Sequence, residues 1–141
     1  MCATDVHATI NLEAPGKHSG WLRIPHSVNR SAYGTVQVPI HTIGNGRAPR
    51  VLLIAGNHGD EFEGQIVLTR LIQQVKAQEI RGTLVILPSL NSAAVRAGTR
   101  ISPLDGGNLN RLFPGDPYGT PTQKLAHFVE HILMARADVV V

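Results

Sequence analysis

Two continuous apolar runs constrain the fold of this chain more than any other feature. Residues 51–55 read Val-Leu-Leu-Ile-Ala and residues 83–87 read Thr-Leu-Val-Ile-Leu. Such runs are typical of strands that are buried on both faces of a parallel sheet. Between them, residues 61–78 carry apolar side chains at helical spacing: Val67, Leu68, Leu71, Ile72 and Val75. The strand–helix–strand order predicts parallel pairing with a right-handed crossover.

Further elements are predicted on both sides of this unit. Short apolar pieces at residues 21–24 and 33–40 predict strands, and we expect Pro39 to confine the second strand to an edge of the sheet. A helix is predicted over residues 121–137, with Thr120 as its N-cap and Pro121 in its first turn. Residues 138–141 then predict the start of a third buried strand.

This order of elements suggests two segments. We expect a β-rich N-terminal segment at residues 1–45, followed at residues 46–141 by the N-terminal part of an α/β domain that is incomplete at its C-terminal end. Residues 88–120 separate the second strand from the last helix and are crowded with Gly, Pro, Asn and Asp. No apolar periodicity is visible there, and structureless stretches of that length are usually functional loops.

The composition excludes several classes of protein. Thirteen Lys and Arg against ten Asp and Glu give a net charge of only +3, and the positive residues are scattered, which argues against a nucleic-acid partner. No apolar stretch approaches the ~18–20 residues of a membrane span, and the N-terminus lacks the pattern of a secretory signal. Cys2 is the single cysteine, so one chain holds neither a disulfide framework nor a cysteine metal cluster. We expect a cytoplasmic protein.

The segment His58-Gly59-Asp60-Glu61 directly follows the first buried run, at the end of a strand where open α/β sheets bind ligands. Imidazole nitrogen and carboxylate oxygen are both good zinc ligands, and a spacing of three lets one loop-to-helix turn present both to one ion. The alternative is that Asp60 or Glu61 only stabilises the start of the helix and that His58 is merely a polar residue.

A second cluster of polar residues lies in the long stretch after residue 88. Arg100 and Arg111 are permanently charged forks that can hold a carboxylate or polarise a carbonyl. Asn110 adds a neutral donor and acceptor beside Arg111. The alternative is an exposed loop that contains Arg and Asn without a binding role.

Another metal motif competes with the first. His127, Glu130 and His131 match the His-x-x-Glu-His pattern of a family of zinc peptidases. On a helical wheel the buried face would consist of Leu125, Phe128, Val129, Ile132 and Leu133. The three motif residues then project toward solvent, so we expect a solvated helix face rather than a metal site.

Taken together, the two loop clusters resemble the succinylglutamate desuccinylase/aspartoacylase family. The resemblance rests on residues 56–64 (Gly-Asn-His-Gly-Asp-Glu-Phe-Glu-Gly), Asn91, Thr99-Arg100 and residues 108–115 (Asn-Leu-Asn-Arg-Leu-Phe-Pro-Gly), and it covers nearly the whole chain. Within the family, the chain is most similar to the branch that deacetylates N-α-acetyl-2,4-diaminobutyrate during ectoine breakdown. Residues 25–27 and 31–34 support that narrower match.

The resemblance implies a zinc-carboxypeptidase-like fold, a three-layer α/β/α arrangement around a mostly parallel mixed sheet. His58 and Glu61 match the family's first two zinc ligands. Arg100 matches the arginine that polarises the scissile carbonyl and stabilises the oxyanion. Asn110 and Arg111 match the pair that grips the substrate carboxylate.

Two features of the family are altered or missing. Asn108 stands where the family more commonly has Asp, which changes the local hydrogen bonding. The third zinc ligand, a His, and the general-base Glu of the family are expected beyond Val141.

The resemblance therefore predicts zinc-dependent hydrolysis of the amide bond of an N-acyl amino acid, with one Zn²⁺ per active site. The expected partner is a small molecule, with no nucleic acid and no membrane, and homo-oligomerisation is left open. The alternatives are a metallocarboxypeptidase that acts on peptides and a non-catalytic module that binds an anion. The 141-residue chain alone is expected to be inactive.

Overall fold

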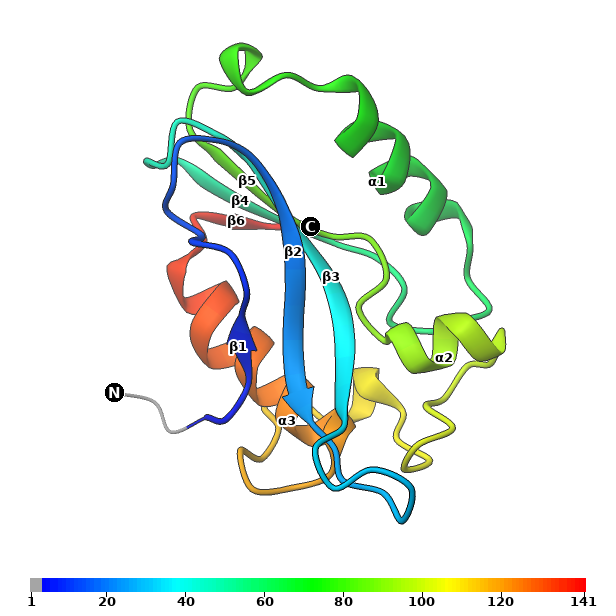
Figure 1. The fold of residues 1–141 in the computed structure, drawn as a ribbon. Coiled ribbons are helices and arrows are strands. Elements are labelled where there is room, and N and C mark those ends of the chain that lie inside the picture. The colour runs from blue at the N-terminus through cyan, green and yellow to red at the C-terminus, as the bar shows by residue number, and fades with distance from the viewer. Residues whose placement is uncertain (1–3) are drawn as a thin grey trace.

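The computed structural model describes residues 4–141 and contains one mixed sheet with strand order β1-β2-β3-β5-β4-β6 (Figure 1). Its strands are β1 His7–Ala8, β2 Gly16–Pro25, β3 Thr35–Gly44, β4 Arg50–Ile54, β5 Thr83–Leu87 and β6 Val139–Val140. The two segments expected from the sequence thus contribute to the same sheet, since β3 pairs with β5.

Helices lie on both sides of this sheet (Figure 1). They are α1 Glu63–Gln74, α2 Ser92–Ala97 and α3 Pro121–Phe128, with 3₁₀ turns at Ala77–Glu79, Leu109–Arg111 and Met134–Arg136 and a π-helical turn at Val129–Leu133. None of the helices described between residues 4 and 141 has the length and apolar character of a membrane-spanning segment.

The predicted strand–helix–strand unit is confirmed. β4 and β5 pair in parallel from Arg50 opposite Thr83 to Ile54 opposite Leu87, with α1 between them in the chain. Alternate residues of β5 pack into two different core clusters, with Val85 in one and Ile86 in the other. These strands are therefore covered on both faces, as their continuous apolar sequences indicate.

Helix α1 is shorter than predicted, and one residue of its expected buried stripe is wrong. The apolar side chains that pack toward the sheet are those of Leu68, Leu71, Ile72 and, just past the helix, Val75. Val67 is instead 61% exposed. Since it sits at the margin of the apolar stripe, it turns toward solvent when the other four face the sheet.

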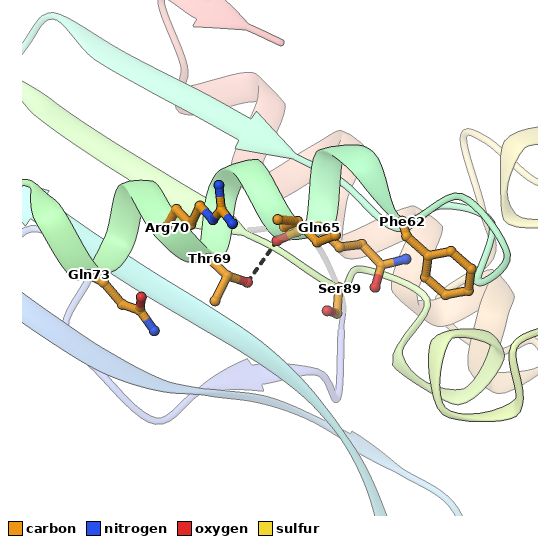
Figure 2. A pocket seen from close by; sticks show the side chains of 7 residues that line it. Phe62, Gln65, Thr69, Arg70, Gln73 and Ser89 are labelled. Atoms are coloured by element: carbon orange, nitrogen blue, oxygen red, sulfur yellow. Dashed lines mark hydrogen bonds between the residues drawn. The ribbon is translucent and has the colours of Figure 1, made fainter.

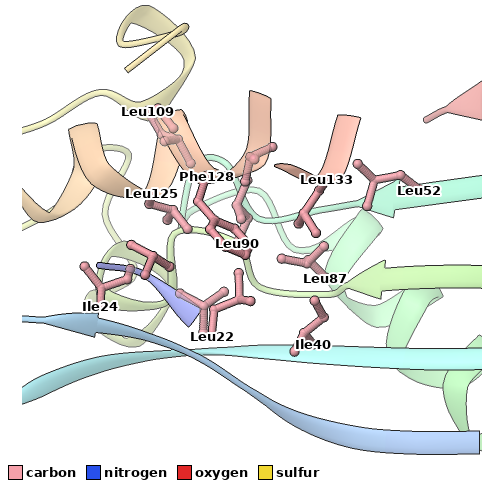
Figure 3. Packing of buried hydrophobic residues seen from close by; sticks show 14 of the residues in the cluster. Leu22, Ile24, Ile40, Leu52, Leu87, Leu90, Leu109, Leu125, Phe128 and Leu133 are labelled. Carbon is pink, nitrogen blue, oxygen red and sulfur yellow. The ribbon is translucent and has the colours of Figure 1, made fainter. Parts of the chain in front are cut away.

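The larger core cluster lies on the face of the sheet away from α1, where it fills the space between the sheet and α3 (Figure 3). It includes Leu22 and Ile40 from the hairpin, Leu87 from β5, and Phe128 and Leu133 from the last helical segment. The predicted helix at residues 121–137 is confirmed in outline, and Thr120 is its N-cap in a capping box with Gln123. A third strand is also present, because β6 pairs in parallel with β4. It is not buried as predicted: Val139 is 50% and Val140 is 44% exposed, since β6 lies at the edge of the described sheet.

The expectation of a mostly parallel sheet is wrong. Three adjacent pairs, β1–β2, β2–β3 and β3–β5, are antiparallel, whereas only β4–β5 and β4–β6 are parallel. The reason is the long β2–β3 hairpin, whose last residues run antiparallel beside β5. A hairpin joins its strands through a short connection and needs no crossover helix.

Strand β3 is not an edge strand, contrary to the expectation from Pro39. It lies between β2 and β5, but β5 pairs only with the end of β3 from His41 to Gly44. Around Pro39, β3 therefore has a neighbour on one side only. A strand that is interior along part of its length can contain a proline in the part where one side is free.

The stretch at residues 88–120 contains helices that its sequence did not reveal. Asn91 caps α2 through its side-chain oxygen, which accepts from the Ala94 N–H at 3.3 Å, and Gly98 ends the helix in the left-handed conformation. The buried residues of α2 are small ones, Ser92, Ala93 and Ala94. Small residues carry no strong apolar periodicity, which is why this helix was missed.

Asp105 ties the same stretch to the start of α3. Its carboxylate accepts from the Thr122 N–H (2.8 Å), the Thr122 hydroxyl (2.7 Å) and the Gly107 N–H (3.0 Å). Burial by itself would raise the pKa of this carboxyl, but the hydrogen bonds from Thr122 and Gly107 outweigh it and hold the pKa of Asp105 below its ordinary value. The ionised carboxylate of Asp105 thus connects the loop to the start of α3 through hydrogen bonds.

We expect Asp105→Asn to lower the free energy of unfolding of the full-length protein by about 1 kcal/mol near neutral pH. The pKa of Asp105 is lower in the folded protein than in the unfolded chain, where an Asp titrates at ~3.9. The stabilisation by its ionised carboxylate is therefore fully present above that pH and is lost as the pH falls through the pKa of the folded state. The difference between variant and wild type should therefore shrink in acid, as measured by denaturant titration at several pH values. Asp116→Asn is the control, because within residues 4–141 the Asp116 carboxylate accepts a single hydrogen bond, from the Tyr118 N–H. A deficit that stays constant down to strongly acid pH would contradict this role.

Candidate metal and substrate site

The loop after β4 is held against α2 by a very close backbone contact. A Cβ on Gly59 would lie 2.1 Å from the carbonyl carbon and oxygen of Ala94, so only glycine fits there. The Gly59 N–H also donates to the carbonyl of Thr99 at 2.9 Å. This contact fixes the path of the loop and places His58, which is only 4% exposed, beside the stretch that follows α2.

The structure brings the two candidate zinc ligands into contact. Nδ1 of His58 lies 3.0 Å from Oε1 of Glu61. Two ligands at the usual zinc distances around a tetrahedral ion are about 3.3 Å apart, so this spacing suits a shared ion. Among the described residues, however, no group of three or more His, Cys, Asp or Glu side chains is arranged to hold a metal.

The other ring nitrogen of His58 is also engaged, and this determines the chemistry of the pair. Nε2 lies 3.1 Å from the side-chain oxygen of Asn108. An amide oxygen only accepts, so Nε2 carries the hydrogen and the lone pair of the neutral ring is at Nδ1. A lone pair facing a carboxylate needs either a second ring proton or a cation between them. The donor set therefore fits a metal ion with one imidazole and one carboxylate ligand.

Glu61 is shared between His58 and the first of the two loop arginines. A hydrogen bond from the His58 ring, made when Nδ1 also carries a proton, is the main cause that lowers the pKa of Glu61, and the Arg100 guanidinium adds to it through a contact of 3.0 Å with the same oxygen. Glu61 is consequently ionised at neutral pH, as a metal ligand must be. Arg100 lies directly beside the candidate ligands.

The remaining two predicted residues are placed differently. Asn110, in the 3₁₀ turn Leu109–Arg111, accepts a hydrogen bond from the side chain of Asn57 at 3.3 Å and so adjoins the His58 loop. Arg111 is exposed, and its side chain makes no hydrogen bond or ion pair within residues 4–141. The structure thus joins Arg100 to the ligands directly and Asn110 through Asn57, and leaves Arg111 unconnected.

Two residues of this network were not given a role from the sequence. Asn108 was noted only as a departure from the family pattern, and Asn57 only as part of the first motif. Their positions on either side of the ligand pair emerge only when the two loops meet in space. In the sequence, these two residues could have been found by their positions: Asn57 directly precedes His58, and Asn108 lies two positions before Asn110.

Two cavities lie near these residues. One, of about 350 Å³, is lined by Ile54, Ala55, Gly56, Asn57, Glu61, Glu63 and Gly64. Another, of about 510 Å³, follows α1 and is lined by Phe62, Gln65, Ile66, Thr69, Arg70, Gln73 and Ser89 (Figure 2). No residue of the second cavity is of a type that ligates zinc, so we assign the chemistry to the first cavity.

The competing motif on the last helix faces solvent only in part, and the expectation is wrong for His127. His127 is only 7% exposed, whereas Glu130 is half-buried and His131 is exposed, with the two imidazole rings 4.4 Å apart. The loop at Gly115 covers the helix at this point, because a Cβ there would lie 2.2 Å from the backbone nitrogen of His127. The apolar face predicted by the helical wheel is nevertheless confirmed, although the helix widens into a π turn at Val129–Leu133. The residues of that face belong to the larger core cluster or pack against it: Leu125, Phe128, Val129, Ile132 and Leu133.

Comparison with known proteins identifies the class to which this fold and loop arrangement belong. The succinylglutamate desuccinylase/aspartoacylase catalytic domain model matches residues 47–141. The N-α-acetyl-L-2,4-diaminobutyric acid deacetylase of Halomonas elongata is 44% identical over 135 residues, which are 96% of this chain and 40% of that protein. The chain belongs to the succinylglutamate desuccinylase/aspartoacylase family.

Solved structures agree with this assignment. A succinylglutamate desuccinylase from Silicibacter sp. TM1040 superposes with a TM-score of 0.95 at 44% identity, covering 99% of this chain and 43% of that one. The product-bound ectoine utilization protein EutE (DoeB) from Ruegeria pomeroyi gives a TM-score of 0.95 at 43% identity, with the same coverage of both chains, 99% and 43%. The chain therefore spans about two fifths of the length of the relatives it matches.

We expect Asn108→Ala to weaken zinc binding by the full-length protein about 10- to 100-fold, because His58 then loses the acceptor that fixes its tautomer and ring orientation. Asn108→Asp retains an acceptor and should bind zinc at least as tightly as wild type. Competition with a chromophoric chelator measures both affinities. The matched control is Asn45→Ala, since Asn45 caps a turn through the Arg47 N–H after the far end of β3. Unchanged affinity in Asn108→Ala would contradict the assignment.

Proposed function

We propose that the protein containing this chain is a zinc-dependent amidohydrolase that removes the acyl group from an N-acyl amino acid. The observation that carries the proposal is the contact of His58 and Glu61 at 3.0 Å, with Arg100 on the same carboxylate oxygen. The family assignment supports the reaction class. The names of the Halomonas and Ruegeria relatives support N-acetyl-2,4-diaminobutyrate as the substrate, with diaminobutyrate and acetate as products.

In this proposal, Nδ1 of His58 and the carboxylate of Glu61 are two of the protein ligands of one zinc ion. The third ligand, a His, and the general-base Glu lie beyond Val141. When bound, the ion supplies a Lewis acid that polarises the amide carbonyl and acidifies a water molecule. The hydrogen bond to Asn108 orients the His58 ring so that the Nδ1 lone pair of His58 would point at the zinc ion.

The arginines and Asn110 act on the substrate. Arg100 donates N–H groups to the carbonyl oxygen as negative charge develops on it, where a preorganised cation lowers the barrier most. Arg111 and the side-chain amide of Asn110 hold the carboxylate of the amino acid, which orients the amide over the ligands. Within residues 4–141 the Arg111 side chain has no hydrogen-bond or ion-pair partner, which leaves its guanidinium available to the substrate carboxylate.

The reaction class can be tested with a substrate panel on the zinc-loaded full-length protein. We expect release of acetate from N-acetyl-2,4-diaminobutyrate and little cleavage of peptides. Preferred cleavage of peptides would favour a carboxypeptidase instead. Binding of the acyl amino acid without turnover would favour a non-catalytic anion-binding module.

The two arginines are expected to affect different kinetic constants. Arg100→Ala should mainly lower kcat, because its interaction strengthens in the transition state, whereas Arg111→Ala should mainly raise KM. Removal of one oxyanion donor is expected to lower kcat by about 10²- to 10³-fold. Arg136→Ala on the last helix provides a control for loss of a positive charge. Equal and negligible effects of the two site variants would contradict these roles.

The 141-residue chain by itself is expected to bind zinc weakly and to be inactive. Among its described residues only two candidate side-chain ligands converge, and affinity depends on the number and preorganisation of ligands. Metal analysis after dialysis, together with an acetate-release assay, measures both properties. A stoichiometric zinc ion with turnover like that of the full-length protein would contradict the need for further ligands.

A further inference from the structure

Asn57 and His58 together connect the loop after β4 to the segment at residues 108–110. The side chain of His58 contacts Asn108, and the side chain of Asn57 donates from Nδ2 to Oδ1 of Asn110 at 3.3 Å. Both bonds connect the same two loops. The first supports the candidate metal ligand, whereas the second leads to the residue proposed to bind the substrate.

The backbone of Asn57 is itself firmly supported. The N–H of Asn91 donates to the carbonyl of Gly56 at 2.9 Å, and the side chain of Asn91 reaches the carbonyl of Asn57 at 3.5 Å. Asn91 also caps α2, so the loop is coupled to a helix end. A group that orients another residue needs this kind of rigid support.

The hydrogen bond from Asn57 determines which end of the Asn110 amide is available. Asn110 is exposed on a single 3₁₀ turn, and a free amide there would rotate between two orientations. Because the side-chain oxygen of Asn110 accepts from Asn57, the NH₂ group of Asn110 points away from Asn57 and is available to a substrate. A substrate carboxylate needs donors, so the opposite orientation would present an oxygen and repel it.

The other end of the Asn57 amide is a buried acceptor. Its Oδ1 is buried and has no hydrogen-bond partner in the described part of the chain. A buried acceptor without a partner adds no stability to the fold, so the contribution of this side chain in the structure is the hydrogen bond that Nδ2 donates to Asn110.

We propose that Asn57 is a positioning residue for substrate binding, which orients the amide of Asn110 so that its NH₂ group faces the substrate carboxylate. This inference rests on the proposed function of the site. Asn57 acts through Asn110 and needs no contact with the substrate or the metal.

A double-mutant cycle on the zinc-loaded full-length protein tests this role. The variants are Asn57→Ala, Asn110→Ala and the double variant, each assayed for kcat and KM with N-acetyl-2,4-diaminobutyrate. Calorimetric binding of 2,4-diaminobutyrate and chelator competition for zinc are measured alongside. Thermal unfolding establishes that each variant is folded, and Asn45→Ala is the matched control.

We expect Asn57→Ala to raise KM and to weaken product binding about tenfold, with kcat and zinc affinity little changed. The double variant should be no worse than Asn110→Ala alone, because Asn57 acts only through that amide. Asn57→Asp should weaken binding further than Asn57→Ala. Its carboxylate only accepts, so it attracts the NH₂ group of Asn110 and turns the amide oxygen toward the substrate.

Fully additive effects of Asn57→Ala and Asn110→Ala would overturn the proposal, and so would a fall in zinc affinity that parallels the loss of binding. A wild-type protein that binds 2,4-diaminobutyrate but hydrolyses no acyl amino acid would refute the proposed function alone, because the calorimetric cycle still measures the coupling. A wild-type protein that neither binds nor hydrolyses would refute both.

Discussion

The packing of Gly59 against the backbone of α2 is the contact on which the candidate site depends. A side chain at this position would overlap the Ala94 carbonyl, and the Gly59 N–H is bonded to Thr99, one residue before Arg100. One contact therefore positions both halves of the cluster. The loop after β4 carries His58 and Glu61, and the segment that follows α2 carries Arg100, whose guanidinium contacts Glu61.

The sheet provides the rigid support for that contact. Strands β4 and β5 are parallel, so their C-terminal ends lie at the same edge and the loops that follow them run side by side. The Ala55 carbonyl accepts from Leu90 and the Gly56 carbonyl accepts from Asn91, so the pairing continues past both strand ends. The polar residues of the two loops are thus held close together, although up to 53 positions separate them in sequence.

Sequence reasoning succeeded where local patterns reflect burial, as in the runs at 51–55 and 83–87 and the helix after Thr120. It failed where partners lie far away in the chain. Residues 45–49 turn the chain from β3 directly into β4, the parallel neighbour of β5, so β3 runs antiparallel to both strands. Which strand of the parallel unit β3 pairs with depends on contacts between distant segments, and no local pattern encodes that choice. The burial of His127 follows from the loop at Gly115, whose approach to α3 a helical wheel does not include.

For the site, the sequence by itself determined the residue types and their order: an imidazole and a carboxylate three positions apart, then two arginines and an asparagine in a later loop. Only the tertiary structure decided which of them touch. It joined Arg100 to Glu61, made Asn108 the partner of His58, and connected Asn110 through Asn57. The Arg111 side chain makes no hydrogen bond or ion pair within residues 4–141. The physical reason is that side-chain hydrogen bonds require separations near 3 Å. Such separations between distant loops are determined by backbone packing, here the approach of Gly59 to α2.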